Sequence, residues 1–234
     1  MPKLDHKLMK LIRIAKPGFK LPTRRTMHLR SRTVGHYSVS RFNQLFEHIV
    51  YINLPERVDR RKHMEEVLKF NNIIAERVDG VRRSPEEGGG QLGCAMAHVN
   101  VLKQFLNSPY QNILIFEDDL EIKPDYLFYL PQKIDFKWDM LFLGVNDARH
   151  GPEKFGNFQR LLCGVCTHAY AVNRSCVSLL ISEIESRYSS TAVDHIYRSL
   201  FQRLLVYAVR PDICFQLFSK FGSNISRRRG AMFI

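Results

Sequence analysis

Several features that would assign this sequence to a common class are missing from it. No apolar run reaches the roughly 20 residues needed to cross a bilayer. The first residues lack the contiguous apolar stretch of a secretory signal. Neither a G-x-G-x-x-G pattern nor a G-K-[ST] ending occurs, so Gly88-Gly89-Gly90 is predicted to form a flexible loop instead of a phosphate loop. These absences favour a cytoplasmic protein that lacks a membrane-spanning helix.

Cysteine is also sparse, with five residues in 234. The count is odd and several cysteines lie inside apolar segments, which indicates reduced thiols instead of a disulfide framework. Cys163 and Cys166 have C-x-x-C spacing, but no second pair follows. Two packed cysteines are therefore favoured over a zinc or redox site.

Acidic residues are almost absent from the first 46 positions, which hold eleven Lys or Arg residues against the single acid Asp5. Most of the formal net charge of +12 therefore lies in residues 1–46, which we interpret as a basic extension, while residues 47–234 are nearly balanced. Leu4, Leu8 and Leu11 predict an amphipathic helix there. Such a helix can lie on an anionic membrane surface or dock on the body of the protein. No nucleic-acid-binding module accompanies the charge, so no nucleic-acid partner is predicted.

The most informative stretch is residues 113–122, where four apolar residues lead directly into Glu117, Asp118 and Asp119. The apolar run is typical of a strand buried on both faces. It must emerge where the acids begin, because an unpaired buried carboxylate is very costly. Ligands bind at this edge in open α/β sheets, and Mg²⁺ and Mn²⁺ prefer oxygen ligands. The pattern therefore predicts a cation–diphosphate site, with a solvated acidic turn closed by Pro124 as the alternative.

The rest of the body alternates between strand-like and helix-like segments, which is typical of an α/β fold. Residues 147–160 are rich in glycine, proline and charge and are predicted to form a loop that covers a site. Predicted strands lie at residues 48–54, 73–80, 113–116, 138–144, 165–172 and 205–209, and predicted helices follow Arg61 and cover residues 91–106, 174–186 and 192–204.

Five polar residues in these segments have both a functional and a structural interpretation. Arg57 and Arg60 at a helix start can reach a phosphate, or they can pair with acids on an exposed helix face. Asp79 can accept hydrogen bonds from a ribose or a base, or it can shape the turn with Gly80. His98 lies near an apolar helix face, where a structural role is commoner than a ligand role. Asp194 can cap its helix or act on a substrate.

Taken in order along the chain, these motifs resemble glycosyltransferase family 25, which includes bacterial lipooligosaccharide galactosyltransferases and collagen hydroxylysine galactosyltransferases. The resemblance covers about residues 48–226. The matching pieces are Ile52-Asn53-Leu54 with Arg57, Asp59 and Arg60; Val78-Asp79-Gly80; Gly93-Cys94 with His98; Ile115-Phe116-Glu117-Asp118-Asp119; Trp138-Asp139 with Leu143-Gly144; Thr167-His168-Ala169-Tyr170; Val193-Asp194; and Tyr207-Ala208-Val209 with Pro211.

The resemblance implies the type A glycosyltransferase fold, a single α/β domain whose central, mostly parallel sheet is flanked by helices. It implies a UDP-sugar donor, commonly UDP-galactose, with Mn²⁺ or Mg²⁺ as the cofactor and inversion at the anomeric carbon. The acceptor is then a hydroxyl of a glycan or a glycosylated protein. The alternative is a catalytically degenerate relative that serves as a sugar- or protein-binding module, although the survival of all three acids argues against it.

The resemblance also implies roles for individual residues. Glu117 and Asp119 are expected to hold the metal. Asp194 is the expected general base, with Asp147 and His195 as weaker candidates. One departure from the family pattern is Ser223-Asn224-Ile225, where many members carry Ser-Asp-Ile. The residues expected to bind the donor are Asn53, Arg57, Arg60, Asp79, His98, Asp118 and His168.

Overall fold

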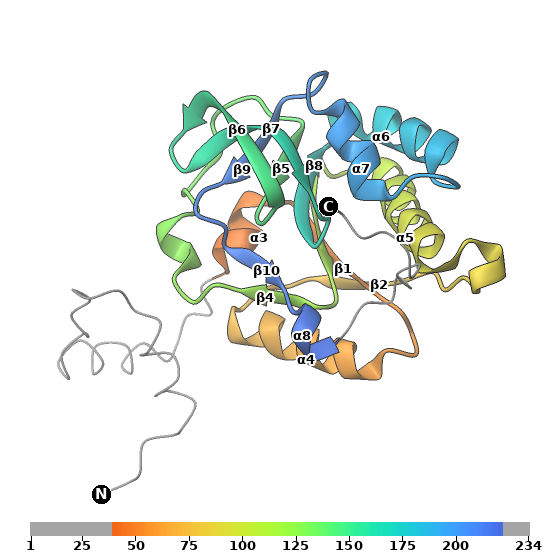
Figure 1. The fold of residues 1–234 in the computed structure, drawn as a ribbon. Helices are drawn as coiled ribbons and strands as arrows, with labels where there is room; N and C mark the ends of the chain where they lie inside the picture. The colour runs from red at the N-terminus through yellow and green to blue at the C-terminus, as the bar shows by residue number, and fades with distance from the viewer. Residues whose placement is uncertain (1–38, 222–234) are drawn as a thin grey trace, which may run out of the picture. The chain divides into compact units, whose positions relative to one another are not determined.

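The structure is a computed structural model that describes residues 39–221 (Figure 1). The predicted basic helix and the Ser223-Asn224-Ile225 motif lie outside these residues. The main sheet has eight strands in the order β2-β1-β3-β8-β5-β9-β7-β6, and β10 and β4 form a second sheet.

The bounds of the strands are β1 (His48–Asn53), β2 (Glu76–Asp79), β3 (Asn112–Glu117), β4 (Leu120–Ile122), β5 (Met140–Phe142), β6 (Asn146–Phe155), β7 (Phe158–Val165), β8 (Ala169–Asn173), β9 (Val206–Val209) and β10 (Cys214–Gln216). The α-helices are α3 (Arg41–Leu45), α4 (Val58–Phe70), α5 (Gly89–Leu106), α6 (Arg174–Arg187), α7 (Val193–Leu200) and α8 (Phe218–Phe221), and the 3-10 helices are η1 (Pro85–Glu87) and η2 (Tyr126–Phe128).

Most strands of the large sheet share one direction. β1 pairs in parallel with β2 and β3, and β5 pairs in parallel with β9. β8 lies between β3 and β5 and is antiparallel to both, so β3 and β5 point the same way. The prediction of an α/β fold with a central, mostly parallel sheet flanked by helices is therefore confirmed.

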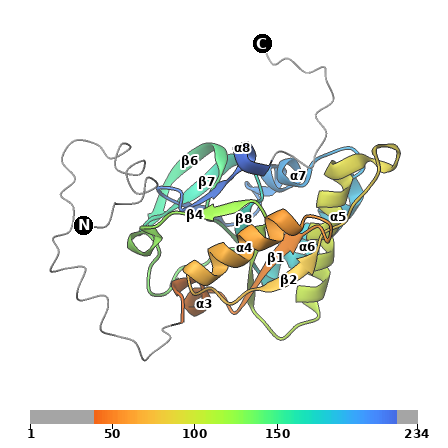
Figure 2. The ribbon, with the colours of Figure 1, turned by 90° about the horizontal axis from the view of Figure 1, so that it is seen from below.

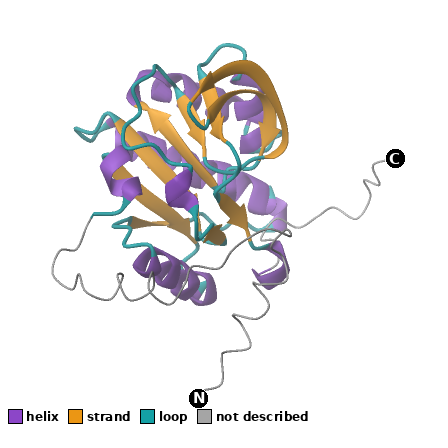
Figure 3. Ribbon diagram, turned by 90° about the vertical axis from the view of Figure 1, so that its left-hand side faces the viewer, coloured by secondary structure: helices purple, strands orange, loops and turns teal. Residues whose placement is uncertain are grey.

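The strands at the centre of this sheet are buried on both faces. On β1, Val50 belongs to one core cluster while Ile49 and Tyr51 belong to the other, and β3 divides Ile115 and Phe116 in the same way. This alternation follows from the two-residue period of a strand. The first cluster includes residues of α5, α6 and α7, and the second includes residues of α3 and α4. Figure 2 and Figure 3 show the strands between these groups of helices.

The chain reverses its winding between β1 and β3. From β1 it passes through α4 to β2, and then through α5 back across β1 to β3. Helices α4 and α5 consequently cover opposite faces of the sheet. A crevice forms outside the carboxyl ends of the strands at such a switch point.

Two local predictions from the sequence are wrong. Residues 147–160 do not form a covering loop, because β6 and β7 pair there as an antiparallel hairpin. β6 is almost entirely exposed, so it lacks the apolar alternation by which a strand is recognised. Gly88-Gly89-Gly90 is not a flexible loop either: Gly88 has a φ of 98° and caps η1, and Gly89 begins α5. Only a glycine adopts this left-handed conformation without steric cost.

Two further observations concern the cysteines and the helices. All five cysteines lie in the described part of the chain, and all are free thiols. Within residues 39–221, none of the helices combines the length and the apolar character that crossing a bilayer requires.

Helix α3 packs into the core although it falls inside the predicted extension 1–46. Phe42 is fully buried; its ring stacks on Tyr126 with centroids 4.8 Å apart and meets Phe116 edge-on at 6.0 Å. The predicted boundary at residue 46 stays a prediction that mutation can test.

Replacing Phe42 with alanine should lower the free energy of unfolding by about 3–5 kcal/mol, because it removes a buried ring between two aromatic neighbours. Urea denaturation measures this change. Val39→Ala is the matched control, since Val39 is 51% exposed, and should change the stability by less than about 0.5 kcal/mol. Equal, small effects of both substitutions would place the boundary after α3.

Candidate functional site

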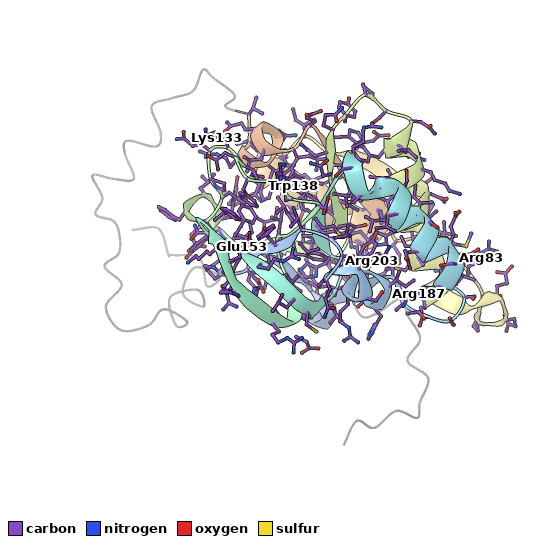
Figure 4. All side chains as sticks on the ribbon, turned by 90° about the horizontal axis from the view of Figure 1, so that it is seen from above. Arg83, Lys133, Trp138, Glu153, Arg187 and Arg203 are labelled. Atoms are coloured by element: carbon purple, nitrogen blue, oxygen red, sulfur yellow. The ribbon has the colours of Figure 1, made fainter. Side chains whose placement is uncertain are left out.

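A cleft of about 310 Å³ opens at the carboxyl ends of β1, β2 and β3. Its walls come from residues 80–83 after β2, from the start of α5 and from the three acids after β3, together with Arg60 and Gln216. Arg83, labelled in Figure 4, belongs to the loop before α5. Gly93 permits this arrangement, because a Cβ atom there would collide with the carbonyl oxygen of Val81. The predicted acidic strand end thus lies in a cleft at the switch point.

Asp118 is the acid that is held by two buried side chains. It is buried, and its Oδ2 accepts a hydrogen bond of 2.7 Å from the side-chain amide of Asn53. Nη1 of Arg60 lies 2.8 Å from its Oδ1. Arg60 is itself buried in the first turn of α4, so the exposed-face interpretation of this arginine is wrong. The three residues join the ends of β1 and β3 to the start of α4.

Asp119 is also buried but is only partly satisfied. Its Oδ2 lies 3.0 Å from Nη1 of Arg60 and accepts a hydrogen bond of 3.2 Å from Gln216. Its Oδ1 is buried and has no hydrogen-bond partner among the described residues. Burial, followed by the charge of Glu117, raises the pKa of Asp119 to about 6 against the opposing effect of Arg60. A carboxylate oxygen of this kind fits a ligand position for a hard cation.

Glu117 contacts a network formed by a threonine, a histidine and two tyrosines. Thr167 donates a hydrogen bond of 2.6 Å to its Oε1, and Nε2 of His98 lies 3.3 Å from the same atom. Nδ1 of His98 lies 2.8 Å from the hydroxyl of Tyr170, which in turn is 3.0 Å from the hydroxyl of Tyr197. Burial opposes ionisation of Glu117, but the contacts with His98 and Thr167 outweigh it and lower its pKa. Glu117 therefore stays a carboxylate at neutral pH.

The other residues predicted to bind the sugar donor do not all line this cleft. Arg57 caps α4 and pairs with Asp59 at 2.8 Å. Asp79 lies beside Asn53 at the end of β2, but it is exposed, pairs with Arg77 and does not line the cleft. His168 precedes β8 instead of lying inside a strand; it is buried, and burial lowers its pKa.

The predicted base Asp194 lies near the start of α7, outside the cleft lining. Its Oδ2 accepts a hydrogen bond of 3.2 Å from the backbone N–H of Cys166, and its Oδ1 one of 2.8 Å from that of His195. Burial, followed by the charges of Glu117 and Asp194, raises the pKa of Cys94. His195 and Asp147 are exposed.

Several residues that complete the site were not predicted. Gln216 reaches Asp119 from β10, which pairs with β4 just after the acids. Arg82 and Arg83 line the cleft and pair with Glu56 and Glu87. No local pattern marks these positions, because the long-range pairing of β10 and the bend after β2 bring them to the cleft.

The cleft can hold a divalent cation with the residues present. Asn53 holds Asp118 by a hydrogen bond but does not hold Glu117 or Asp119 in this way. The buried Oδ1 of Asp119, which has no hydrogen-bond partner among the described residues, fits an oxygen-liganded cation. Phosphate oxygens commonly complete the coordination of such an ion. The fold and this cleft define an α/β protein with an acidic ligand site at the carboxyl edge of its sheet.

Comparison with known sequences finds a family that matches the segment containing this site. Residues 46–159 match the family model described as glycosyltransferase family 25 (LPS biosynthesis protein). This segment contains Asn53, Arg60, His98 and all three acids of the cleft. The resemblance to glycosyltransferase family 25 predicted from the sequence is therefore confirmed.

Individual relatives are more distant. Procollagen galactosyltransferase 2 of Mus musculus is 27% identical over 129 residues, which cover 42% of this chain and 21% of that protein. The chain thus matches about a fifth of the length of this curated relative. Among solved structures, a glycosyltransferase involved in glycosylation of the major capsid protein of PBCV-1 covers 70% of this chain and 80% of its own at 10% identity with a TM-score of 0.41. A Drosophila β-1,4-galactosyltransferase 7 variant in complex with manganese, UDP-Gal and xylobiose covers 72% and 69% at 14% identity with a TM-score of 0.39. Neither structural likeness is close enough to carry an argument.

Substitution of the two neighbouring aspartates should have opposite effects on stability in the absence of divalent cations. The pKa of Asp119 is raised, so the folded state binds more protons than the unfolded state between about pH 4 and pH 6, and its stability falls as the pH rises through that range. Asp119→Asn should therefore raise the free energy of unfolding at pH 7 by roughly 1–3 kcal/mol and give little gain at pH 4. Urea denaturation in the presence of a chelator measures both values.

Asp118→Asn is the matched comparison. It removes the negative charge that lies 2.8 Å from Nη1 of the buried Arg60 and should destabilise the protein by about 3–5 kcal/mol. A loss of stability in both variants would contradict the division of roles between the two acids.

Proposed function

We propose that this protein is a glycosyltransferase with the type A fold, which moves galactose from UDP-galactose to a hydroxyl of a glycan or glycosylated protein with inversion and with the help of Mn²⁺ or Mg²⁺. The observation that carries the proposal is the pair Glu117 and Asp119 at the switch-point cleft, within the segment that matches the family. The name of the relative procollagen galactosyltransferase 2 supports galactose as the sugar, and the buried Oδ1 of Asp119, which has no hydrogen-bond partner among the described residues, supports the metal. We further propose that the protein works in the cytoplasm.

Glu117 and Asp119 would hold the cation through one carboxylate oxygen each. When bound, the cation neutralises the charge that develops on a departing diphosphate. Arg60 cannot replace it, because its guanidinium is already within 2.8–3.0 Å of Asp118 and Asp119. The protein's own contribution is a rigid frame, since Asn53, Arg60 and Thr167 hold the acids by hydrogen bonds or ion pairs.

The uridine end of the donor would lie against the loop after β2. Gly80, Val81 and Arg83 line the cleft there, and Asp79 lies one residue away at its margin. The backbone of this loop is fixed, because the N–H of Gly80 donates to the carbonyl oxygen of Asn53 at 2.8 Å. Arg83 adds a positive charge near the position expected for the diphosphate.

Inversion requires the acceptor hydroxyl to attack from the face opposite the leaving group while a base takes its proton. Asp194, near the start of α7 and outside the cleft lining, is the candidate, and two backbone N–H groups orient its carboxylate. An acceptor that enters between α7 and the acids would meet this carboxylate after the donor is bound. We propose Asp194 as the general base on this placement and on the family motif.

The proposal can be tested with the purified chain, a panel of UDP-sugars and Mn²⁺. UDP-galactose with Mn²⁺ should raise the melting temperature and be slowly hydrolysed, whereas Asp119→Ala should lose the Mn²⁺-dependent part of UDP binding and keep its fold. Asp135→Ala, a change at a surface residue paired with Lys133, is the matched control and should bind like the wild type. A folded wild-type chain inert toward all UDP-sugars would favour the degenerate, sugar- or protein-binding alternative.

Asp194→Ala should retain UDP and Mn²⁺ binding and lose transfer by about 10²–10⁴-fold, because the base acts on the acceptor and not on the donor. Calorimetry of UDP binding and initial rates of sugar transfer separate the two effects. His195→Ala changes the adjacent exposed side chain and should transfer at close to the normal rate. Normal transfer by the Asp194 variant would rule this residue out as the base.

A further inference from the structure

We propose that Cys94, His98 and Glu117 form a binding site for a thiophilic divalent cation of the zinc type, distinct in its chemistry from the oxygen-liganded site of Glu117 and Asp119. The ligand atoms of these three residues all lie within 4.8 Å of one another. All three line the cleft.

Rigid elements bring the three donors together. Cys94 and His98 are four residues apart on α5, so they lie on the same face of the helix. Glu117 is the last residue of β3, which is held between β1 and β8. The Nε2 atom of His98 and the Oε1 atom of Glu117 are 3.3 Å apart. Tetrahedral zinc with bonds of 2.0–2.2 Å to nitrogen and oxygen places such ligand atoms about 3.3–3.6 Å apart. The sulfur of Cys94 lies within 4.8 Å of both atoms and completes a three-residue set.

The surroundings of the set orient its ligands. The hydroxyl of Tyr170 lies 2.8 Å from Nδ1 of His98, and that of Tyr197 lies 3.0 Å beyond it. A metal bound to Nε2 requires the proton of His98 on Nδ1, where it can be donated to the hydroxyl of Tyr170, in place of the contact of Nε2 with Glu117. Thr167 fixes the carboxylate from the other side at 2.6 Å. Hydrogen bonds of this kind to metal ligands typically change metal affinity by about 10–100-fold.

The donor set selects the type of cation. Thiolate and imidazole ligands favour zinc and cobalt over magnesium and manganese, which prefer oxygen. Three protein ligands leave the fourth position of a tetrahedral ion open toward the cleft. Binding there displaces the thiol proton of Cys94 and takes Glu117 into the coordination of the soft ion. If the proposed transfer function holds, zinc at this site therefore opposes activity supported by Mn²⁺, since both ions need Glu117.

Cobalt(II) titration of the full chain tests the site without any sugar donor. Coordination by Cys94 should produce a thiolate-to-cobalt charge-transfer band in the near ultraviolet, and Zn²⁺ should abolish it by displacement. Cys94→Ser should lose the band and weaken Zn²⁺ binding by more than about tenfold in competition with a chromophoric chelator. Cys163→Ser, which alters a partly exposed cysteine outside the set, is the matched control and should keep both properties.

A second variant keeps the test decisive if Cys94→Ser fails to fold. Tyr170→Phe retains all three ligands but removes the hydroxyl that orients His98, so it should keep the band and weaken Zn²⁺ binding by about 10–100-fold. Absence of the band in folded wild-type protein, or its persistence in Cys94→Ser, would overturn the proposal. Because these readouts need no UDP-sugar, a cobalt band in a chain without transfer would count against the proposed function alone. Transfer without a band would count against this site alone.

Discussion

Arg60 is buried beside Asp118 and Asp119, two of the three consecutive acids. Its ion pair with Asp118 determines the surroundings that remain for Glu117 and Asp119. A buried guanidinium needs carboxylate partners close by, since an unpaired buried charge is strongly destabilising. Asp118 takes this role together with Asn53, at 2.8 and 2.7 Å. All three acids line the cleft, but both oxygens of Asp118 are held by Asn53 and Arg60, whereas Oδ1 of Asp119 has no hydrogen-bond partner among the described residues. The ion pair thereby fixes the start of α4 against the end of β3.

The electrostatics of the cleft follow from this division. Glu117 is surrounded by donors and keeps a lowered pKa, while Asp119 has a buried oxygen without a partner among the described residues and a pKa raised to about 6. The protein thus stabilises the anionic form of Glu117. At Asp119, burial and the charge of Glu117 disfavour the anionic form. Under the proposed function a bound cation would supply that balance, and the residue that lowers the stability of the metal-free protein would be the one that binds the metal.

The sequence predicted the parts of the site that are encoded locally. The apolar run before Glu117 predicted both the strand and the place where it ends, and the alternation of strands and helices predicted the α/β class. The burial of Arg60 was not predicted, because it depends on how α4 packs against the sheet and not on the helical pattern. Gln216 could not be predicted, since it reaches Asp119 only through the pairing of β10 with β4. The exposed β6 hairpin was missed because solvent-facing strands carry no apolar period.

The two parts of the chain that meet at the cleft supply different kinds of groups. The segment 46–159 that matches the family contains the charged residues, with Glu117, Asp118 and Asp119 facing Arg60. Their partners from the later segment are neutral and include the Thr167 hydroxyl and the Gln216 amide. Neutral donors orient carboxylates without cancelling their charge. Thr167 and Gln216 therefore leave the negative charge of Glu117 and Asp119 in place, and the two other arginines that line the cleft, Arg82 and Arg83, pair with Glu56 and Glu87 instead.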